Sequence, residues 1–260
     1  MVSIWRFNSI IMLSRDIGIL EQPSNPRQIA NLKAWYGDYV NGGTLRTTLA
    51  NGANVNQWDD ISGNNFHMSN KYGQPTYNSA GNFIYTKNNG LWHGTHDVMT
   101  GSESRTVFVI TETPEGGGSN NYWAMFGYWN GIAGQSWVMN YGGSKNYLQS
   151  FSTFFRQGIA LTNNKTYINV MKYTSGTFAA GFSWRWQGET NTPEFSQNAN
   201  VTPNNKAGVA IGGLLTNSTT YSPANYGVNN KEIIYYNRAL ELDEIIKIET
   251  YLKIKYSVTY

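Results

Sequence analysis

The sequence predicts an all-β fold, in which two antiparallel sheets form a jelly-roll sandwich that ends in a short C-terminal helix. About twelve short segments of strand-like composition are separated by turn residues, which is typical of a sandwich or jelly roll. Aromatic residues make up 15% of the 260 residues and charged residues only 13%, whereas ordinary globular domains carry about 25% charged residues. The chain then closes with an apolar strand and a helix.

Residues 1–26 form a predicted arm outside the sandwich. Two prolines in Gln22–Pro26 favour an extended or turn path, and strand-like alternation begins only after them. Residues 27–260 are expected to form one jelly-roll domain, because no linker splits them and no tandem repeat is visible.

The predicted strands are short and separated by polar loops. Edge strands are expected at Gln74–Tyr77 and Phe83–Tyr85, since Pro75 cannot donate to a ladder. Trp58 and Ile61 anchor a turn that contains Asp59 and Asp60. The other predicted strands are Leu32–Tyr36, Arg105–Thr113, Tyr122–Tyr128, Ser136–Asn140, Tyr147–Ser152, Thr166–Lys172, Thr177–Gln187, Ala207–Gly212 and Lys231–Tyr236.

The closing helix is predicted from Glu241 to Tyr256. Asp243 and Glu244 fall in its first turn, where negative charge favours the helix dipole. Its predicted packing face is apolar at four of five positions. That face consists of Leu242, Ile245, Ile246, Glu249 and Leu252.

Composition excludes several classes of function. The 19 Lys and Arg residues and the net charge of +3 form no basic stripe of the kind that binds nucleic acid. The chain has no cysteine, which excludes disulfides, thiol catalysis and Cys-zinc sites. No segment approaches the roughly 20 apolar residues of a membrane span. The apolar run Ile10–Leu13 is too short for a secretory signal, so conventional secretion is not expected.

Three stretches together resemble the concanavalin A-like lectin/glucanase superfamily, in its laminin-G-like jelly-roll branch. Leu32–Tyr36 resembles the opening strand of that branch, and Gln57–Asn64 with Gln74–Tyr77 resembles its "W-D-S-G-N … Q-P-T" pattern. Glu232–Leu240, followed by Glu244 and Tyr251, Leu252 and Tyr256, resembles its closing strand and helix. The resemblance implies two sheets of curved strands, with ligands often held on the concave face or at the loops of one rim.

The sequence departs from this family pattern at three places. The usual Ser or Thr cap of the closing helix is Glu241, a poorer cap. Gln187–Glu189 replaces the "NG" turn, and the arm at residues 1–26 has no counterpart.

The superfamily includes glycoside hydrolases, which need two carboxyl groups about 5–9.5 Å apart. In its glucanase branch both carboxyls sit on one strand, in an E-x-D pattern. The only such pattern here is Glu241-Leu242-Asp243, and it begins the predicted helix. No other acids pair at strand spacing, so the protein is predicted not to be an enzyme.

No cofactor is predicted, although calcium stays an alternative. Oxygen donors that suit calcium are present at Asp59, Asp60, Asn64 and Asn65, but an Asx-type turn is the favoured explanation of these residues.

The histidines do not make a convincing metal site. His93 and His96, with Asp97 beside them, are too few for zinc, which takes three or four ligands. Together with His67 they are expected to be loop residues with local hydrogen bonds.

Aromatic side chains are the abundant functional resource. Flat aromatic faces beside amide and hydroxyl groups can bind sugars, which present apolar C–H patches and many hydroxyls. Trp123, Trp129 and Trp137 are the candidate carbohydrate-binding residues, because each lies close to Asn, Gly or Ser. Trp184 and Trp186 share one strand face, and core packing is the competing role for every tryptophan.

The leading hypothesis is a non-enzymatic virion or surface protein, such as a tailed-phage decoration, fibre or adhesin. It would display a lectin-like jelly roll that binds glycans, and the arm would anchor it to other subunits by β-augmentation. The expected state is an oligomer at the virion or extracellular surface. The predicted partner-anchoring residues are Trp5, Phe7, Ile10, Ile11 and Leu13.

Two alternatives stay open from the sequence. The chain could be a free bacterial carbohydrate-binding module or lectin whose arm folds onto its own sandwich. It could also be a glycoside hydrolase or lyase, which the carboxylate pattern disfavours.

Overall fold

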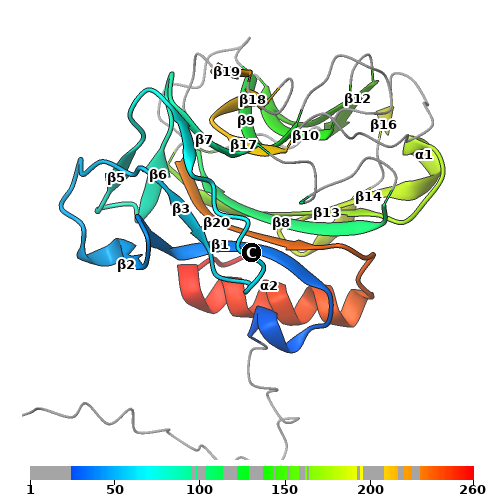
Figure 1. Cartoon of the computed structure of the whole chain (residues 1–260). Coiled ribbons are helices and arrows are strands. Elements are labelled where there is room, and N and C mark those ends of the chain that lie inside the picture. Colours follow the sequence, from blue (N-terminus) through cyan, green and yellow to red (C-terminus); the bar gives the residue numbers. More distant parts are fainter. Residues whose placement is uncertain are drawn as a thin grey trace, which may run out of the picture.

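The computed structural model describes residues 25–94, 98, 103–113, 122–128, 137–142, 145–150, 153–157, 162, 164–191, 194–195, 208–215, 220–223 and 229–260. These residues form two curved layers of strands with a helix beneath one of them (Figure 1). Every strand pairing within them is antiparallel. The predicted all-β sandwich with a C-terminal helix is therefore confirmed.

The first sheet follows the order β15-β14-β13-β8-β20-β1-β2 within the described part of the chain. β3 also pairs with β1, and the β5–β6 hairpin pairs with the start of β20. Its strands are β1 (Leu32–Val40), β2 (Thr44–Leu45), β3 (Trp58–Asp60), β5 (Thr76–Asn78), β6 (Phe83–Tyr85), β8 (Arg105–Glu112), β13 (Thr166–Tyr173), β14 (Phe182–Trp186), β15 (Glu189–Asn191) and β20 (Asn229–Tyr236).

The second sheet follows the order β16-β12-β11-β10-β9-β17-β7-β4. Its strands are β4 (Asn70–Tyr72), β7 (Gly90–His93), β9 (Tyr122–Tyr128), β10 (Trp137–Gly142), β11 (Lys145–Ser150), β12 (Thr153–Gln157), β16 (Glu194–Phe195) and β17 (Val209–Ile211). A separate hairpin joins β18 (Gly213–Leu215) to β19 (Tyr221–Pro223). The helices are η1 (Pro26–Gln28), η2 (Arg46–Thr48), α1 (Phe178–Gly181) and α2 (Leu242–Tyr256). Within the described residues, no helix has the length and apolarity to cross a bilayer.

Several predicted strands need correction. The residues Trp58–Asp60, expected to be a turn, form strand β3, because Trp58 is buried in the core and the strand pairs with β1. The predicted strand Thr177–Gln187 begins with the short helix α1, since the N–H of Gly181 donates to Thr177 O and its carbonyl accepts from Thr174 N. Short strands β2, β4, β7, β12, β15, β16, β18 and β19 were not predicted.

Contacts with the sandwich extend to Asn25 and Pro26, which the sequence assigns to the arm. Asn25 caps η1 by accepting the Arg27 N–H, and Pro26 is already buried. The Tyr236 hydroxyl donates to Pro26 O at 2.8 Å. Residues 25 and 26 therefore pack with the domain.

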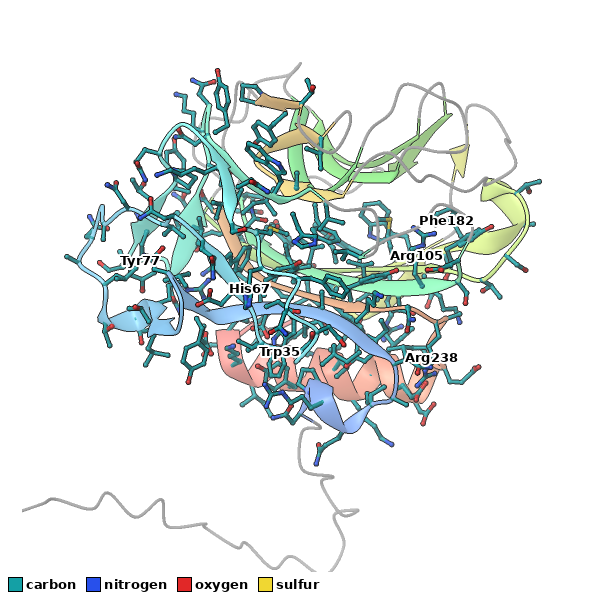
Figure 2. The ribbon with its side chains drawn as sticks, in the orientation of Figure 1. Trp35, His67, Tyr77, Arg105, Phe182 and Arg238 are labelled. Atoms are coloured by element: carbon teal, nitrogen blue, oxygen red, sulfur yellow. The ribbon has the colours of Figure 1, made fainter. Side chains whose placement is uncertain are left out.

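Two apolar clusters hold the layers together. The first lies between the sheets and includes Tyr36, Trp58, Trp184 and Trp186. The second lies between the first sheet and α2, and Trp35 contributes to it (Figure 2). The second cluster buries apolar surface of both α2 and the first sheet. Such burial stabilises a fold by about 25 cal/mol per Å², so α2 is an integral part of the fold.

The packing face of α2 differs from the predicted one. Ile245, Ile248, Glu249 and Leu252 are buried, whereas Leu242 and Ile246 are 54% and 44% exposed. Ile246 follows Ile245 by about 100° around the helix, so both cannot face the sheet. The true face follows i, i+3, i+4 and i+7 spacing.

Glu244 and Arg238 stabilise the N-terminus of α2 and compensate for Glu241, which is a weak N-cap residue. The Glu244 carboxylate accepts the N–H of Glu241 at 3.0 Å and a bond from Arg238 Nη1 at 2.8 Å. The bond from Arg238 lowers the pKa of Glu244. An ionised Glu244 at the first turn also suits the helix dipole.

A buried carboxylate joins β20 to β1 and α2. Glu232 is fully buried. Its Oε1 accepts from Trp35 Nε1 at 2.6 Å and Tyr251 OH at 3.2 Å. Its Oε2 accepts from Tyr256 OH at 2.7 Å and lies 2.7 Å from Lys255 Nζ. Burial raises the pKa of both tyrosines, which keeps their hydroxyls available as donors.

Glu232→Gln is expected to destabilise the protein strongly. The substitution keeps the side-chain shape but removes the charge and turns an amide NH₂ toward existing donors. Breaking a buried ion pair from one side costs about 3–5 kcal/mol. Chemical denaturation should show a lower midpoint at an unchanged slope.

Asp243→Asn is the control for this variant. Asp243 is 70% exposed and its carboxylate lies 3.8 Å from Lys247 Nζ, and exposed ion pairs contribute little to stability. Equal midpoints for the two variants would contradict a structural role for Glu232.

Candidate functional site

The predicted carbohydrate-binding tryptophans fall in or near two adjacent strands. Trp123 is opposite Tyr141 in the β9–β10 ladder, and Trp137 is opposite Tyr128. Trp129, and the side chains of Trp123 and Trp137, lie outside the described residues. Their role in binding sugar stays a prediction.

The predicted partner-anchoring residues cannot be placed either. Trp5, Phe7, Ile10, Ile11 and Leu13 all lie outside the described residues. Their role also stays a prediction.

Core packing is confirmed for two tryptophans of β14. Trp184 and Trp186 are 1% and 2% exposed. The Trp186 ring stacks on Tyr167 with centroids 4.6 Å apart. These rings fill the space between the sheets.

His67 and His93 have local hydrogen-bond partners. His67 Nδ1 accepts the N–H of Asp60 at 3.1 Å, and His93 Nδ1 lies 3.0 Å from His67 O. His96 and Asp97 lie outside the described residues. Within the described residues, no three His, Asp or Glu side chains gather as a metal site would require.

Asp59 and Asp60 support the backbone around them. Asp60 accepts N–H bonds from Trp35 at 2.8 Å, Ser62 at 2.9 Å and Phe66 at 3.0 Å. Asp59 accepts from the N–H of Gly43 at 2.7 Å. These bonds fix the loops at both ends of β3, which is the structural role the Asx-turn alternative described.

An aromatic stack stands at the β4–β7 edge of the second sheet. The rings of Trp92 and Tyr221 are 4.9 Å apart and 9° from parallel, and Tyr72 packs on Tyr221 at 5.7 Å. The Tyr221 hydroxyl donates toward Ile211 O at 2.9 Å. Only Tyr72, 45% exposed, presents much of its ring to solvent.

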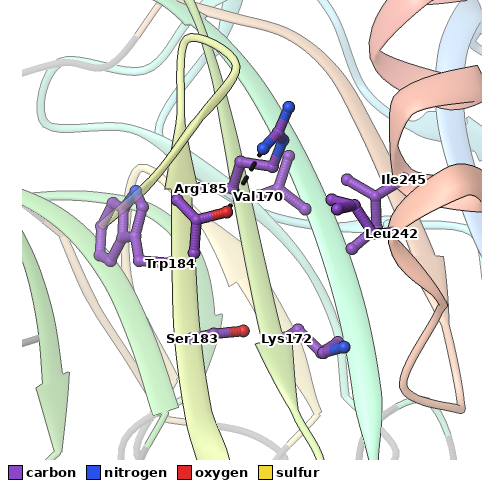
Figure 3. Close-up of a pocket in the computed structure, with 8 residues that line it drawn as sticks. Val170, Lys172, Ser183, Trp184, Arg185, Leu242 and Ile245 are labelled. Carbon is purple, nitrogen blue, oxygen red and sulfur yellow. Dashed lines mark hydrogen bonds between the residues drawn. The ribbon is translucent and has the colours of Figure 1, made fainter. Parts of the chain in front are cut away.

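A small hollow lies between the outer face of the first sheet and the start of α2 (Figure 3). Its volume is about 200 Å³. Arg185 Nε donates to both oxygens of Glu249 at 2.8 and 2.9 Å, and Nη1 donates to Thr190 Oγ1. Lys172 Nζ donates to Leu240 O at 3.2 Å. Burial raises the pKa of Glu249, and the bond from Arg185 opposes that rise. Arg185 thus holds α2 to the sheet through Glu249, and Lys172 holds the loop before α2, so the hollow is a structural junction.

A larger hollow lies where the β5–β6 hairpin meets the start of β20. We call it the hairpin hollow. Its volume is about 370 Å³, which falls within the usual range of ligand sites, about 300–1,000 Å³. Its lining combines aromatic, amide and hydroxyl groups. The lining residues are Asn51, Gly52, Thr76, Tyr77, Asn78, Phe83, Tyr85 and Asn229.

Strand register explains why these side chains gather. Tyr85 is opposite Thr76 on β5 and opposite Asn229 on β20. Directly opposed residues point to the same face of a sheet. Tyr77 and Ile84 alternate with them and belong to the core between the sheets. The hollow is therefore on the outer face of the first sheet, at the end marked by Tyr77 in Figure 2.

Asparagines shape the loops around the hairpin hollow. Asn51 Oδ1 accepts the N–H of Ser79 at 3.1 Å, and Asn78 Oδ1 accepts that of Gly81 at 2.9 Å. Gly52 has a φ of +78°, which favours glycine, and its N–H donates to Tyr77 O.

Among the described residues that line the hairpin hollow, Asn229 is the one with a buried polar atom left unpaired. The residue is 5% exposed, and nothing in the described part of the chain pairs with its buried Oδ1. An unpaired buried acceptor costs about 1–3 kcal/mol, so such groups are rare unless a ligand or water completes them. The sequence alone does not single out Asn229, because only long-range strand pairing brings it beside Tyr85.

No family model matches this sequence, and no curated protein matches it. Solved structures do share the fold. Trypanosoma rangeli sialidase in complex with sialic acid is 12% identical, with a TM-score of 0.53 over 89% of this chain and 34% of that chain. The receptor binding domain of botulinum neurotoxin C/D mosaic serotype is 11% identical, with a TM-score of 0.54 over 86% of this chain and 52% of that chain.

The ligand binding domain of botulinum neurotoxin serotype D, in complex with N-acetylneuraminic acid, is also similar. It is 11% identical, with a TM-score of 0.50 over 86% of this chain and 51% of that chain. This chain thus spans about a third of the sialidase and about half of the toxin domains. At such identities the similarity shows the fold alone, and the finer laminin-G-like resemblance stays a prediction.

Asn229→Leu is expected to stabilise the protein by about 1 kcal/mol, because it removes a buried acceptor that has no partner. Thermal or chemical unfolding of the full chain measures this change. Asn64→Leu is the matched control, since Asn64 Nδ2 donates to Lys33 O at 2.9 Å, and its loss should destabilise. Equal destabilisation by both variants would show that Asn229 has a structural role.

Proposed function

We propose that the sandwich is a non-enzymatic carbohydrate-binding domain and that the hairpin hollow holds the glycan. One observation carries the proposal: a hollow of suitable volume combines aromatic rings, amide groups and a buried unpaired acceptor at Asn229. Sugars present apolar C–H faces and hydroxyl donors, which suit such a lining. The similar sialidase and toxin domain bind sialic acids, which supports sugar recognition on this fold.

The proposal that the domain is not an enzyme rests on where its carboxylates lie. None of the described residues that line the hairpin hollow is acidic, whereas most glycoside hydrolases need two carboxyls beside the scissile bond. Glu112, which is opposite Asn229 in the ladder, is paired with Lys231 at 3.0 Å. The E-x-D pattern lies at the start of α2, with Glu241 at the N-cap and Asp243 in the first turn.

Glycan binding is tested with the full chain on a glycan array, followed by titration of each ligand found. Tyr85→Ala should weaken binding tenfold or more, because the aromatic anchors of binding sites contribute about 2 kcal/mol or more and about 1.4 kcal/mol is already tenfold. Tyr260→Ala is the control, since Tyr260 is 41% exposed and does not line the hollow.

Three results would count against parts of this proposal. Loss of binding in Tyr72→Ala but not Tyr85→Ala would move the site to the aromatic stack. Absence of binding to any glycan would contradict the proposed carbohydrate-binding function. Release of sugar from a polysaccharide by the full chain would favour the hydrolase alternative.

We further propose that the segment before Asn25 attaches the sandwich to other subunits of a virion or surface assembly. The apolar residues Trp5, Phe7, Ile10, Ile11 and Leu13 support this role, since an extended apolar segment can add a strand to a neighbour. The competing role is a free lectin whose arm serves only its own sandwich.

A chain that starts at Asn25 is expected to fold and to keep its glycan affinity, because η1 and its bond to Tyr236 are retained. It should lose the oligomeric state of the full chain, as measured by light scattering after size exclusion. Ile11→Asp in the full chain should also cause loss of the oligomeric state. An unchanged oligomeric state in both variants would favour the free lectin.

A further inference from the structure

The proposed glycan site has a specific pattern of hydrogen-bonding groups. Asn229 offers a buried acceptor, Oδ1, that no described residue pairs with. Asn51 and Asn78 use their Oδ1 atoms for backbone N–H groups, which leaves their NH₂ groups to act as donors. Thr76 and Tyr85 add hydroxyls that can donate or accept. The ligand must therefore supply at least one donor to Asn229 and acceptors elsewhere.

The described charges beside the hairpin hollow are paired with one another. No charged residue is among the described residues that line it. Beside it, Lys231 Nζ lies 3.0 Å from Glu112 Oε2 and donates to Gly81 O at 2.6 Å. Lys231 is 7% exposed, so its amine is already committed to protein groups. Arg46 is fully buried and donates to Lys231 O.

An acidic sugar would fit this arrangement poorly. A carboxylate can only accept hydrogen bonds, so an acidic sugar would have to complete the Asn229 acceptor with one of its hydroxyls and place its carboxylate elsewhere in the hollow. That carboxylate would lose hydration in a hollow whose described lining residues carry no charge, and no described cation beside it is free to offset the loss. A neutral sugar hydroxyl, in contrast, both donates and accepts.

We propose that the hairpin hollow selects uncharged saccharides, one of whose hydroxyls donates to Asn229 Oδ1, and discriminates against sialic acid and other acidic sugars. This inference rests on the proposed glycan-binding function and names its ligand class. It differs from the sialic acids found in the similar sialidase and toxin domain.

The test compares ligands on the full chain by saturation-transfer NMR and calorimetry. The probes are galactose, glucose and mannose, with their disaccharides, against N-acetylneuraminic acid and glucuronic acid. At least one neutral sugar should bind tenfold more tightly than either acid. Its affinity should change less than twofold between 50 and 500 mM salt, since no ion pair forms.

Two variants make the test sharper. Asn229→Leu should weaken the neutral sugar at least tenfold while the protein stays folded. Asn51→Arg places a cation at an exposed position of the lining, and it should raise the affinity for the acidic sugars at least threefold.

The possible failures are distinguishable. Tighter binding of an acidic sugar, lost in Tyr85→Ala, would overturn the neutral-ligand inference and leave the proposed function standing. Neutral binding that is unchanged in Asn229→Leu would overturn the role of Asn229. Binding of neither class would overturn the proposed function itself.

Discussion

The buried carboxylate of Glu232 is the constraint on which the arrangement of the first sheet and α2 depends. Four donors from β1 and α2 meet its two oxygens inside the protein. A buried charge is tolerated only when it is paired and fully hydrogen-bonded. Trp35, Tyr251, Tyr256 and Lys255 must therefore keep one geometry. The carboxylate thereby fixes how the helix sits on the sheet, which apolar contact alone would leave less specific.

The same strand also positions the hairpin hollow. β20 carries Glu232 in its middle and Asn229 at its start, and it pairs with β1, β8 and β6. Since Glu232 fixes β20 relative to β1, the register with β6 places Asn229 opposite Tyr85. The β5–β6 hairpin has few other strand partners within the described residues. A central strand thus determines the geometry of a site at the sheet's outer face.

Local patterns predicted the strong elements well. β8, β13, β20 and α2 have long apolar or periodic sequences, and these elements were found within a few residues of the predicted bounds. Asp59 and Asp60 suggested a turn, but tertiary pairing made them strand. The candidate site was not predictable in the same way, because Tyr85 and Asn229 meet only through pairing across a long sequence separation. Glu232, a lone acid in an apolar strand, was a visible signal of a buried ionic contact.

The two described hollows on the outer face of the first sheet differ in whether their polar groups have partners within the protein. Around the smaller one, Arg185, Glu249 and Lys172 have partners within the protein, so a ligand there would have to replace contacts that hold α2. In the hairpin hollow, Asn229 keeps a buried acceptor without a described partner, and Asn51 and Asn78 present free amide donors. A site that leaves polar groups unmet sacrifices some stability in the free protein. A ligand that supplied the missing donor would recover that stability, which is the physical reason to propose recognition there.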